Sequence, residues 1–133
     1  MEKDNILITG GTGSIGRELI RQLEGNNIFV LSRHEEAQVL TKQEFPHVHF
    51  IIGDIRDEHA VREAVCGMNY VFHVAALKHV NICEEQPQEA IKTNILGTMN
   101  VINACHHFGA KMINMSSDKA INPGNVYGRT KAL

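Results

Sequence analysis

The chain of 133 residues has few cysteines, no long apolar run and no surplus of charge of one sign. Cys66, Cys83 and Cys105 are widely spaced and form no Cys-x-x-Cys pair, which argues against a disulfide framework and against a zinc site. No stretch of about 20 apolar residues is present to span a bilayer, and the amino terminus lacks the pattern of a secretory signal. These absences favour a cytoplasmic protein with reduced thiols and no membrane attachment.

The charge balance also excludes several kinds of partner. The formal net charge is −2, so broad electrostatic binding to nucleic acid or to an anionic membrane is not expected. Of the eight histidines, His106 and His107 are adjacent and point away from each other on a helix, and we expect no metal site. The length and the 43% hydrophobic content are typical of one globular domain.

Apolar residues alternate between short runs and helical spacing along the chain. Short runs typical of strands occupy residues 6–9, 27–32, 48–52, 70–75 and 111–115, and helical spacing occupies residues 14–23, 35–45, 57–66 and 87–108. Strands that are apolar on both faces and alternate with helices predict an α/β fold with a doubly wound parallel sheet. The right-handed crossover rule favours a Rossmann arrangement with strand order 3-2-1-4-5.

A glycine-rich turn separates the first predicted strand from the first predicted helix, and its glycines lie at positions 10, 13 and 16. Such a turn needs residues without Cβ, because a dinucleotide pyrophosphate approaches the backbone closely and accepts hydrogen bonds at the helix N-terminus. The strand-turn-helix context therefore predicts dinucleotide binding. The residues expected to contact the cofactor here are Gly10, Thr12, Gly13, Ser14, Ile15 and Gly16.

The end of the second strand predicts which dinucleotide is bound. An NAD site usually ends this strand with an acid that holds the ribose diol, whereas this chain has Ser32 and Arg33. A hydroxyl and a guanidinium suit a 2′-phosphate, so the residues favour NADP over NAD. Glu35 and Glu36 leave an alternative open, because they are either solvated residues of a helix or acids that reach back to a ribose.

Two further loops lie at the same predicted edge of the sheet. Asp54 and Ile55 follow the third strand, where they could accept a hydrogen bond from the adenine amine and pack on the ring, although Gly-Asp is also common in plain turns. Ala75 and Ala76 follow the fourth strand and permit close approach of the cofactor, and Lys78 lies just beyond them. We expect all five residues to contact the cofactor.

The residues that could carry chemistry follow the fifth strand. Ser117, Asp118 and Lys119 lie at the carboxyl ends of the strands, where open parallel sheets bind ligands. Tyr127 and Lys131 are four apart and share a helix face, so the ammonium could lower the pKa of the phenol and hold the nicotinamide ribose. The alternatives are a Tyr that is simply packed and a solvated charged turn.

These motifs together resemble the amino-terminal part of an extended short-chain dehydrogenase/reductase. The segments 75–80, 117–123 and 125–128 are similar to the polysaccharide-biosynthesis branch, which includes the UDP-N-acetylglucosamine 4,6-dehydratases of capsule and flagellin-sugar pathways. The Asp118-Lys119 pair is the most specific element, because dTDP-glucose dehydratases usually have Asp-Glu there and 4-epimerases usually lack the acid pair. Asn81 departs from the family, in which many members have Pro.

The resemblance implies a lyase that removes water from a UDP-N-acetylhexosamine with NADP as cofactor. Tyr127 would take the C4 hydroxyl proton, with Lys131 beside it and Ser117 orienting the hydroxyl. Lys119 would then abstract the C5 proton while Asp118 protonates the departing C6 hydroxyl. A 4-epimerase, which needs no Asp-Lys pair, and a non-catalytic dinucleotide-binding module remain alternatives.

The family pattern also bears on the extent of the chain. Asn94 matches a position that supports the active site and cofactor through hydrogen bonds. Because family members continue well beyond this length, we expect residues 1–133 to form an incomplete NAD(P)-binding Rossmann domain that stops before the substrate-binding domain. We therefore expect the isolated chain to be inactive and the full-length form to be a homo-oligomer.

Overall fold

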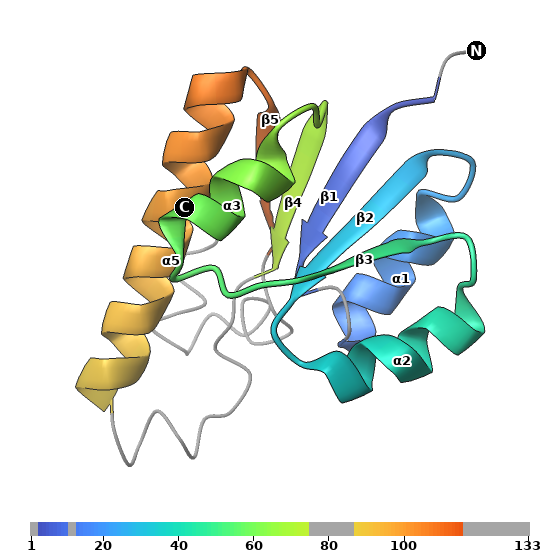
Figure 1. Ribbon diagram of the computed structural model, residues 1–133, viewed down its shortest axis with the longest axis horizontal. Helices are drawn as coiled ribbons and strands as arrows, with labels where there is room; N and C mark the ends of the chain where they lie inside the picture. The colour runs from blue at the N-terminus through green and yellow to red at the C-terminus, as the bar shows by residue number, and fades with distance from the viewer. Residues whose placement is uncertain (1–2, 11–12, 75–86, 116–133) are drawn as a thin grey trace, which may run out of the picture.

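A computed structural model describes residues 3–10, 13–74 and 87–115. Within these ranges, one sheet contains five parallel strands in the order β3-β2-β1-β4-β5. The strands are β1 (Asn5–Thr9), β2 (Asn27–Ser32), β3 (His49–Ile52), β4 (Tyr70–Val74) and β5 (Lys111–Met115). The helices are α1 (Ser14–Gln22), α2 (Glu35–Glu44), α3 (Glu58–Val65) and α5 (Pro87–Phe108) (Figure 1). The predicted α/β class, parallel sheet and strand order are confirmed.

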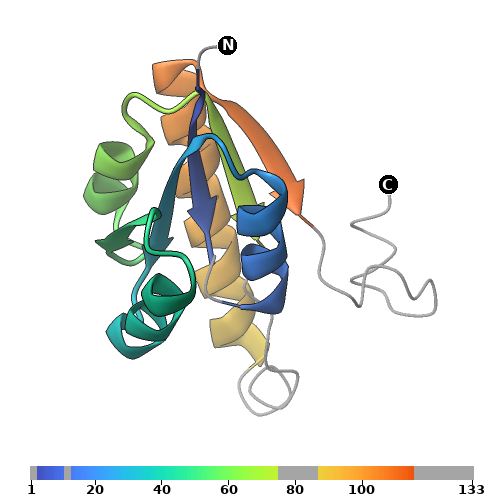
Figure 2. The same cartoon turned by 90° about the vertical axis from the view of Figure 1, so that its right-hand side faces the viewer.

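Two apolar cores lie on opposite faces of the sheet because side chains alternate along each strand. In β1, Leu7 joins one core with residues of α3 and α5, whereas Ile6 and Ile8 join the other core with Ile20 of α1. All four side chains are at most 3% exposed. Figures 1 and 2 show α1 and α5 on opposite sides of the strands. The sheet is therefore wound on both faces, as the near-continuous apolar strands predict.

Local residues explain where several helices begin or end. Gly13 is the N-cap of α1, and Asp57 is the N-cap of α3, where its carboxylate accepts a hydrogen bond from the backbone N–H of His59 at 3.0 Å. Gly109 follows the last residue of α5 with a φ of 75°, a left-handed conformation that terminates helices and that glycine adopts most readily. The helices thus stop near the positions that the sequence indicates.

Helix α5 carries apolar side chains on both its inner and its outer side. Its inner side contributes Val101, Ala104 and Cys105 to the core, and burial raises the pKa of the Cys105 thiol. Its outer side exposes Ile95 and Leu96. In the parts of the chain that the structure describes, no helix is both long and apolar enough to cross a membrane.

Helix α5 also packs closely against the loop that follows β3. A Cβ atom at Gly97 would overlap the Cδ1 atom of Ile55 and lie 2.7 Å from its Cγ1 atom. The side chain of Asn100 donates a hydrogen bond from Nδ2 to the backbone oxygen of Ile55 at 2.8 Å. The absence of a side chain at position 97 therefore lets α5 hold this loop in place.

We predict that Gly97→Ala destabilises the chain by about 1–2 kcal/mol, because overpacking against Ile55 outweighs the roughly 1 kcal/mol that alanine gains in a helix. Urea denaturation measures the free energy of unfolding. The double variant Gly97→Ala/Ile55→Ala should lose less stability than the sum of the two single variants, since the overlapping atoms are removed. If the losses in the free energy of unfolding simply add, the side chains at positions 97 and 55 do not overlap.

Candidate functional site

The carboxyl ends of the strands bring the predicted cofactor loops to one edge of the sheet. The register aligns Thr9 of β1 with Leu31 of β2 and with His73 of β4, and it aligns Ser32 with Ile52 of β3. The loops after β1, β2 and β3 therefore leave the sheet side by side (Figure 1). Open parallel sheets bind ligands at this edge.

Gly10 begins the turn after β1 in a conformation that requires glycine. Its φ is 75°, and its N–H donates to the backbone oxygen of Leu31 at 3.3 Å. A Cβ atom at this position would lie 3.3 Å from the backbone oxygen of Val74, at the end of β4. Glycine therefore lets the turn pack closely against the end of β4, at the position where a dinucleotide-binding turn is expected.

The start of α1 fits the same ligand. Gly13 has an extended conformation and, in the part of the chain that the structure describes, no side chain caps the first amides of the helix, which fits an anion-binding helix N-terminus. The first turn carries no acidic residue that would repel one. Ser14 is exposed, Ile15 packs against the core beside α1, and Gly16 is buried. The cofactor contacts expected of these residues remain a prediction.

The residues at and after the end of β2 differ in how accessible their side chains are to a ligand. Ser32 is 9% exposed, and its Oγ accepts a hydrogen bond from the backbone N–H of His34 at 3.2 Å. The side chain of Arg33 is 54% exposed. Glu35 and Glu36 are exposed in the first turn of α2. Arg33 is therefore better placed than Ser32 to meet a phosphate from solvent.

The side chain of Gln38, on α2, bridges the ends of β2 and β3, a contact that the sequence analysis missed. The side chain is 5% exposed, and Nε2 donates to the backbone oxygens of Ser32 and Ile51, each at 3.0 Å. A polar residue on a helix is usually solvated, so the sequence carries no local signal for this role. The amide fixes the separation of the two strands where their loops begin.

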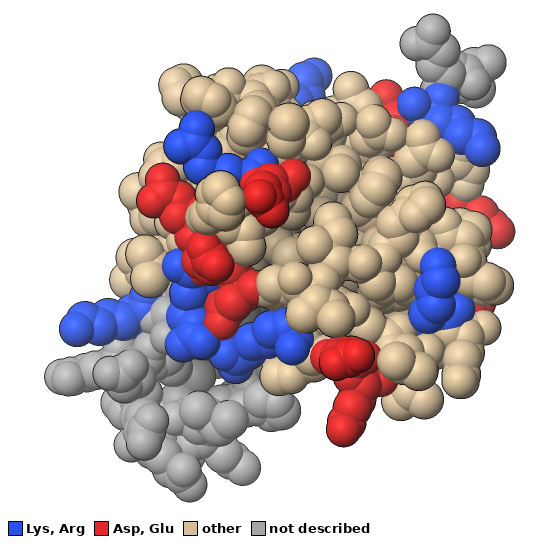
Figure 3. Space-filling model, in the orientation of Figure 1, with Lys and Arg blue, Asp and Glu red and all other residues tan. Residues whose placement is uncertain are grey.

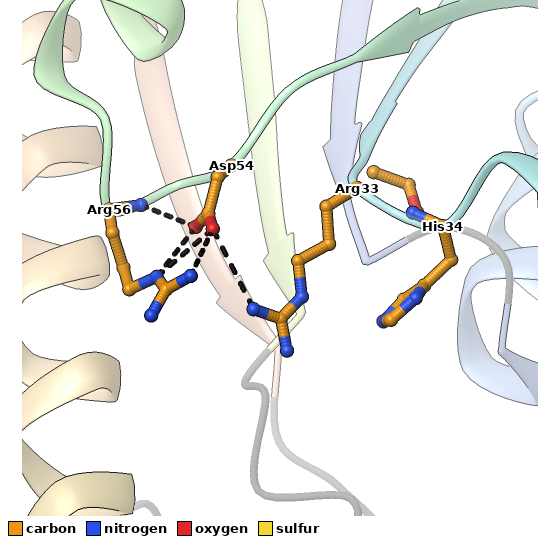
Figure 4. Close-up of polar contacts among 5 residues, drawn as sticks. Arg33, His34, Asp54 and Arg56 are labelled. Atoms are coloured by element: carbon orange, nitrogen blue, oxygen red, sulfur yellow. Dashed lines mark hydrogen bonds and ion pairs between the residues drawn. The ribbon is translucent and has the colours of Figure 1, made fainter.

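Arg33, Asp54 and Arg56 form a group of charges that we name the Asp54 cluster (Figure 4). The two guanidiniums point toward the carboxylate from opposite sides, and His34 lies on the other side of Arg33. Nη2 of Arg56 lies 2.6 Å from Oδ2 of Asp54, whereas Nη1 of Arg33 lies 3.6 Å from it. Hydrogen bonds from Arg56 are the main reason that the pKa of Asp54 lies below its ordinary value.

The surface around these loops carries charge of both signs. In Figure 3, basic side chains border acidic ones over the loops that follow β2 and β3. Both oxygens of Asp54 accept hydrogen bonds from Arg56, a role that the sequence analysis did not assign to either residue. Ile55 is half-buried against α5. The adenine contacts expected of Asp54 and Ile55 stay predictions.

A buried hydrogen-bond chain connects β1, β4 and α5. Nδ1 of His73 lies 2.6 Å from Oγ1 of Thr9, and Nε2 lies 3.0 Å from Oγ1 of Thr98. His73 is fully buried. The signal that could have revealed it is a single polar ring within the otherwise apolar run of β4. The chain of bonds holds the end of β1, directly before the glycine turn, against α5.

Asn94 lies one helical turn before Thr98 on α5. Its Oδ1 atom is buried, and no hydrogen-bond donor reaches it among the residues that the structure describes. An unsatisfied buried acceptor costs free energy, so this atom fits a donor supplied by another part of the protein or by a ligand. The predicted supporting role of Asn94 is compatible with this position and remains untested.

The remaining sequence-predicted residues fall outside the described ranges. They include part of the cofactor set and the entire catalytic set: Thr12, Ala75, Ala76, Lys78, Ser117, Asp118, Lys119, Tyr127 and Lys131.

We predict that Asp54→Asn lowers the melting temperature at neutral pH and that this difference disappears in acid. Because the pKa of Asp54 is lowered from 3.8, its charge stabilises the fold above that value, and the stabilisation is lost as the pH falls through the folded-state pKa. Thermal unfolding of both proteins from about pH 7 to about pH 2 measures the difference, because the scan must pass below the lowered pKa of Asp54. Glu24→Gln, in an exposed turn, is the control and should follow the wild type. A difference that persists in strong acid would contradict this account.

The chain is similar in sequence to known proteins along most of its length. The family model described as "Polysaccharide biosynthesis protein" matches residues 6–133. A UDP-N-acetylglucosamine 4,6-dehydratase (inverting) from Campylobacter jejuni is 46% identical over 97% of this chain and 41% of its own length. A UDP-glucose 4-epimerase from Rickettsia rickettsii is 42% identical over 96% of this chain and 40% of its own. The chain thus spans about two fifths of these curated relatives.

Solved structures agree in fold. The X-ray structure of Pen from Bacillus thuringiensis matches with a TM-score of 0.84 and 43% identity, over 98% of this chain and 42% of that one. A double mutant of DesIV, a dTDP-glucose 4,6-dehydratase from Streptomyces venezuelae with NAD bound, matches with a TM-score of 0.68 and 26% identity, over 79% of this chain and 36% of that one. The chain therefore belongs to the polysaccharide biosynthesis protein family of extended short-chain dehydrogenases/reductases, and its relatives include proteins named as sugar-nucleotide dehydratases and epimerases.

Proposed function

We propose that the chain is the cofactor-binding part of an NADP-dependent 4,6-dehydratase that acts on a UDP-N-acetylhexosamine. The glycine turn at Gly10, which leaves bare peptide against the end of β4, supports dinucleotide binding most directly. The Asp118-Lys119 pair supports dehydration, and the identity to the Campylobacter jejuni enzyme supports this substrate class. The expected cytoplasmic location and homo-oligomer remain predictions.

The cofactor would supply a hydride acceptor and return the hydride to the sugar, so that the reaction is a redox-neutral loss of water. In this proposal Tyr127 takes the C4 hydroxyl proton, and Lys131 stabilises the phenolate. The resulting C4 ketone acidifies the C5 proton, which Lys119 removes, and Asp118 gives a proton to the C6 hydroxyl as it leaves as water. Ser117 orients the C4 hydroxyl.

The choice of NADP rests on the loop after β2. Arg33 is more than half exposed at the edge where the ribose would lie, and a guanidinium is well suited to a phosphate. Because DesIV is named with NAD bound, the cofactor must be determined for this chain itself. The sugar-binding portion would lie in the part of the relatives that this chain does not span.

We predict that calorimetry of this chain gives a lower Kd for NADP than for NAD, and that Arg33→Met removes the difference. Loss of one charge-assisted contact to the 2′-phosphate should weaken NADP about tenfold or more and leave NAD nearly unchanged. Arg62→Met, on the exposed side of α3, is the matched control and should bind both dinucleotides like the wild type. Equal affinities in the wild type would refute the choice of cofactor.

We predict that the intact protein converts UDP-N-acetylglucosamine to a 4-keto-6-deoxy sugar, whereas residues 1–133 alone give little or no product. Product formation is followed by mass spectrometry and NMR. Tyr127→Phe should lower kcat by about 10²- to 10⁴-fold, the usual loss for a general base. Formation of the C4 epimer without loss of water would favour the epimerase alternative. The similarity to the UDP-glucose 4-epimerase of Rickettsia rickettsii supports that alternative. Product from the short chain would contradict its predicted inactivity.

A further inference from the structure

The Asp54 cluster divides its contacts unequally between the two arginines. The Nε atom of Arg56 lies 3.1 Å from Oδ1 and 3.0 Å from Oδ2 of Asp54, and Nη2 lies 2.6 Å from Oδ2. The backbone N–H of Arg56 also donates to Oδ1 at 2.9 Å. Arg33 approaches the carboxylate at 3.6 Å, beyond hydrogen-bond distance. Arg56 therefore satisfies the carboxylate, and Arg33 only flanks it.

The charges of the cluster lead to the same conclusion. Two guanidiniums and one carboxylate sum to a net charge of +1, and the close pair of Asp54 and Arg56 is neutral. A carboxylate has about four lone-pair sites, and the donors of Arg56 occupy most of them. The surplus positive charge consequently resides on Arg33, whose side chain is 54% exposed.

The backbone around Arg56 is held in place on both sides. The N–H of Asp57 donates to the backbone oxygen of Asp54 at 2.9 Å, and Asp57 caps α3. The backbone oxygen of Ile55 accepts from Asn100 on α5 at 2.8 Å. This loop presents Arg56 to Asp54 without further ordering, so the pair is preorganised before any ligand arrives.

We propose that Arg56 is a specificity-determining positioning residue, which holds the carboxylate of Asp54 and thereby leaves the guanidinium of Arg33 available for the 2′-phosphate of NADP. The inference rests on the proposed use of NADP. Without Arg56, the freed oxygens of Asp54 would pair with Arg33, their neighbour at 3.6 Å, and would repel a phosphate. NAD carries no 2′-phosphate, so its affinity should change much less.

The test compares Kd values for NADP and NAD, measured by calorimetry, in the wild type, Arg56→Met, Asp54→Asn and the double variant Asp54→Asn/Arg56→Met. Met keeps most of the apolar stem of Arg56, and Asn keeps an acceptor for the backbone N–H of Arg56. The readout is the ratio of the two Kd values, because a fraction of unfolded protein or an altered adenine contact affects both dinucleotides alike. Arg62→Met is the control for loss of one surface charge.

We expect Arg56→Met to reduce the preference for NADP about tenfold, the scale of one charge-assisted contact. The double variant should regain the preference of the wild type, because no carboxylate is left to compete for Arg33. Asp54→Asn alone should keep or increase the preference.

An unchanged ratio in Arg56→Met would overturn the inference. A ratio that falls in Arg56→Met and stays low in the double variant would also overturn it, because Arg56 would then bind the phosphate itself. A wild type without preference for NADP would instead refute the cofactor proposal on which the inference rests. Failure of the inference about Arg56 and failure of the NADP proposal would therefore give different results.

Discussion

The pairing of β1 with a parallel neighbour on each side is the constraint on which the rest of the structure depends. Because β1 pairs with β2 and with β4 in parallel, all three strands end at the same edge of the sheet. This places the turn at Gly10 against Val74 and next to the loop that carries Arg33. A shift of one residue in either ladder would turn apolar side chains to the wrong face and separate these loops.

The order of the strands was predictable because it follows from periodicity and from general rules of chain crossover. Ile6, Leu7 and Ile8 make the middle of β1 apolar at consecutive positions, which is typical of a central parallel strand covered on both faces. Gly10 was also predictable, since its role follows from a local turn between a strand and a helix. Local patterns of this kind are fully contained in the sequence.

Contacts between distant segments could not be predicted in the same way. Sequence reasoning assigned Asp54 to adenine and gave Arg56 no role, although the two are only two positions apart, because the direction of a side chain in a loop is set by tertiary contacts. The link between His73 and Thr98 joins β4 to α5, and the overlap of Gly97 with Ile55 depends on how closely two elements approach. The polar ring of His73 within β4 signals a buried polar residue but not its partner, and the closeness of Gly97 to Ile55 has no local signature. The catalytic residues expected after β5 lie beyond the described ranges, so their prediction stands on sequence alone.

The position of Gln38 has a consequence for recognition. One side-chain amide donates to backbone oxygens at the ends of both β2 and β3, so the two strands cannot splay apart without losing hydrogen bonds. The segments that follow these strands carry the opposing charges of the Asp54 cluster. The two segments are therefore fixed relative to each other where they begin. A ligand that contacted both would not have to order two independent loops, which would lower the entropic cost of its binding.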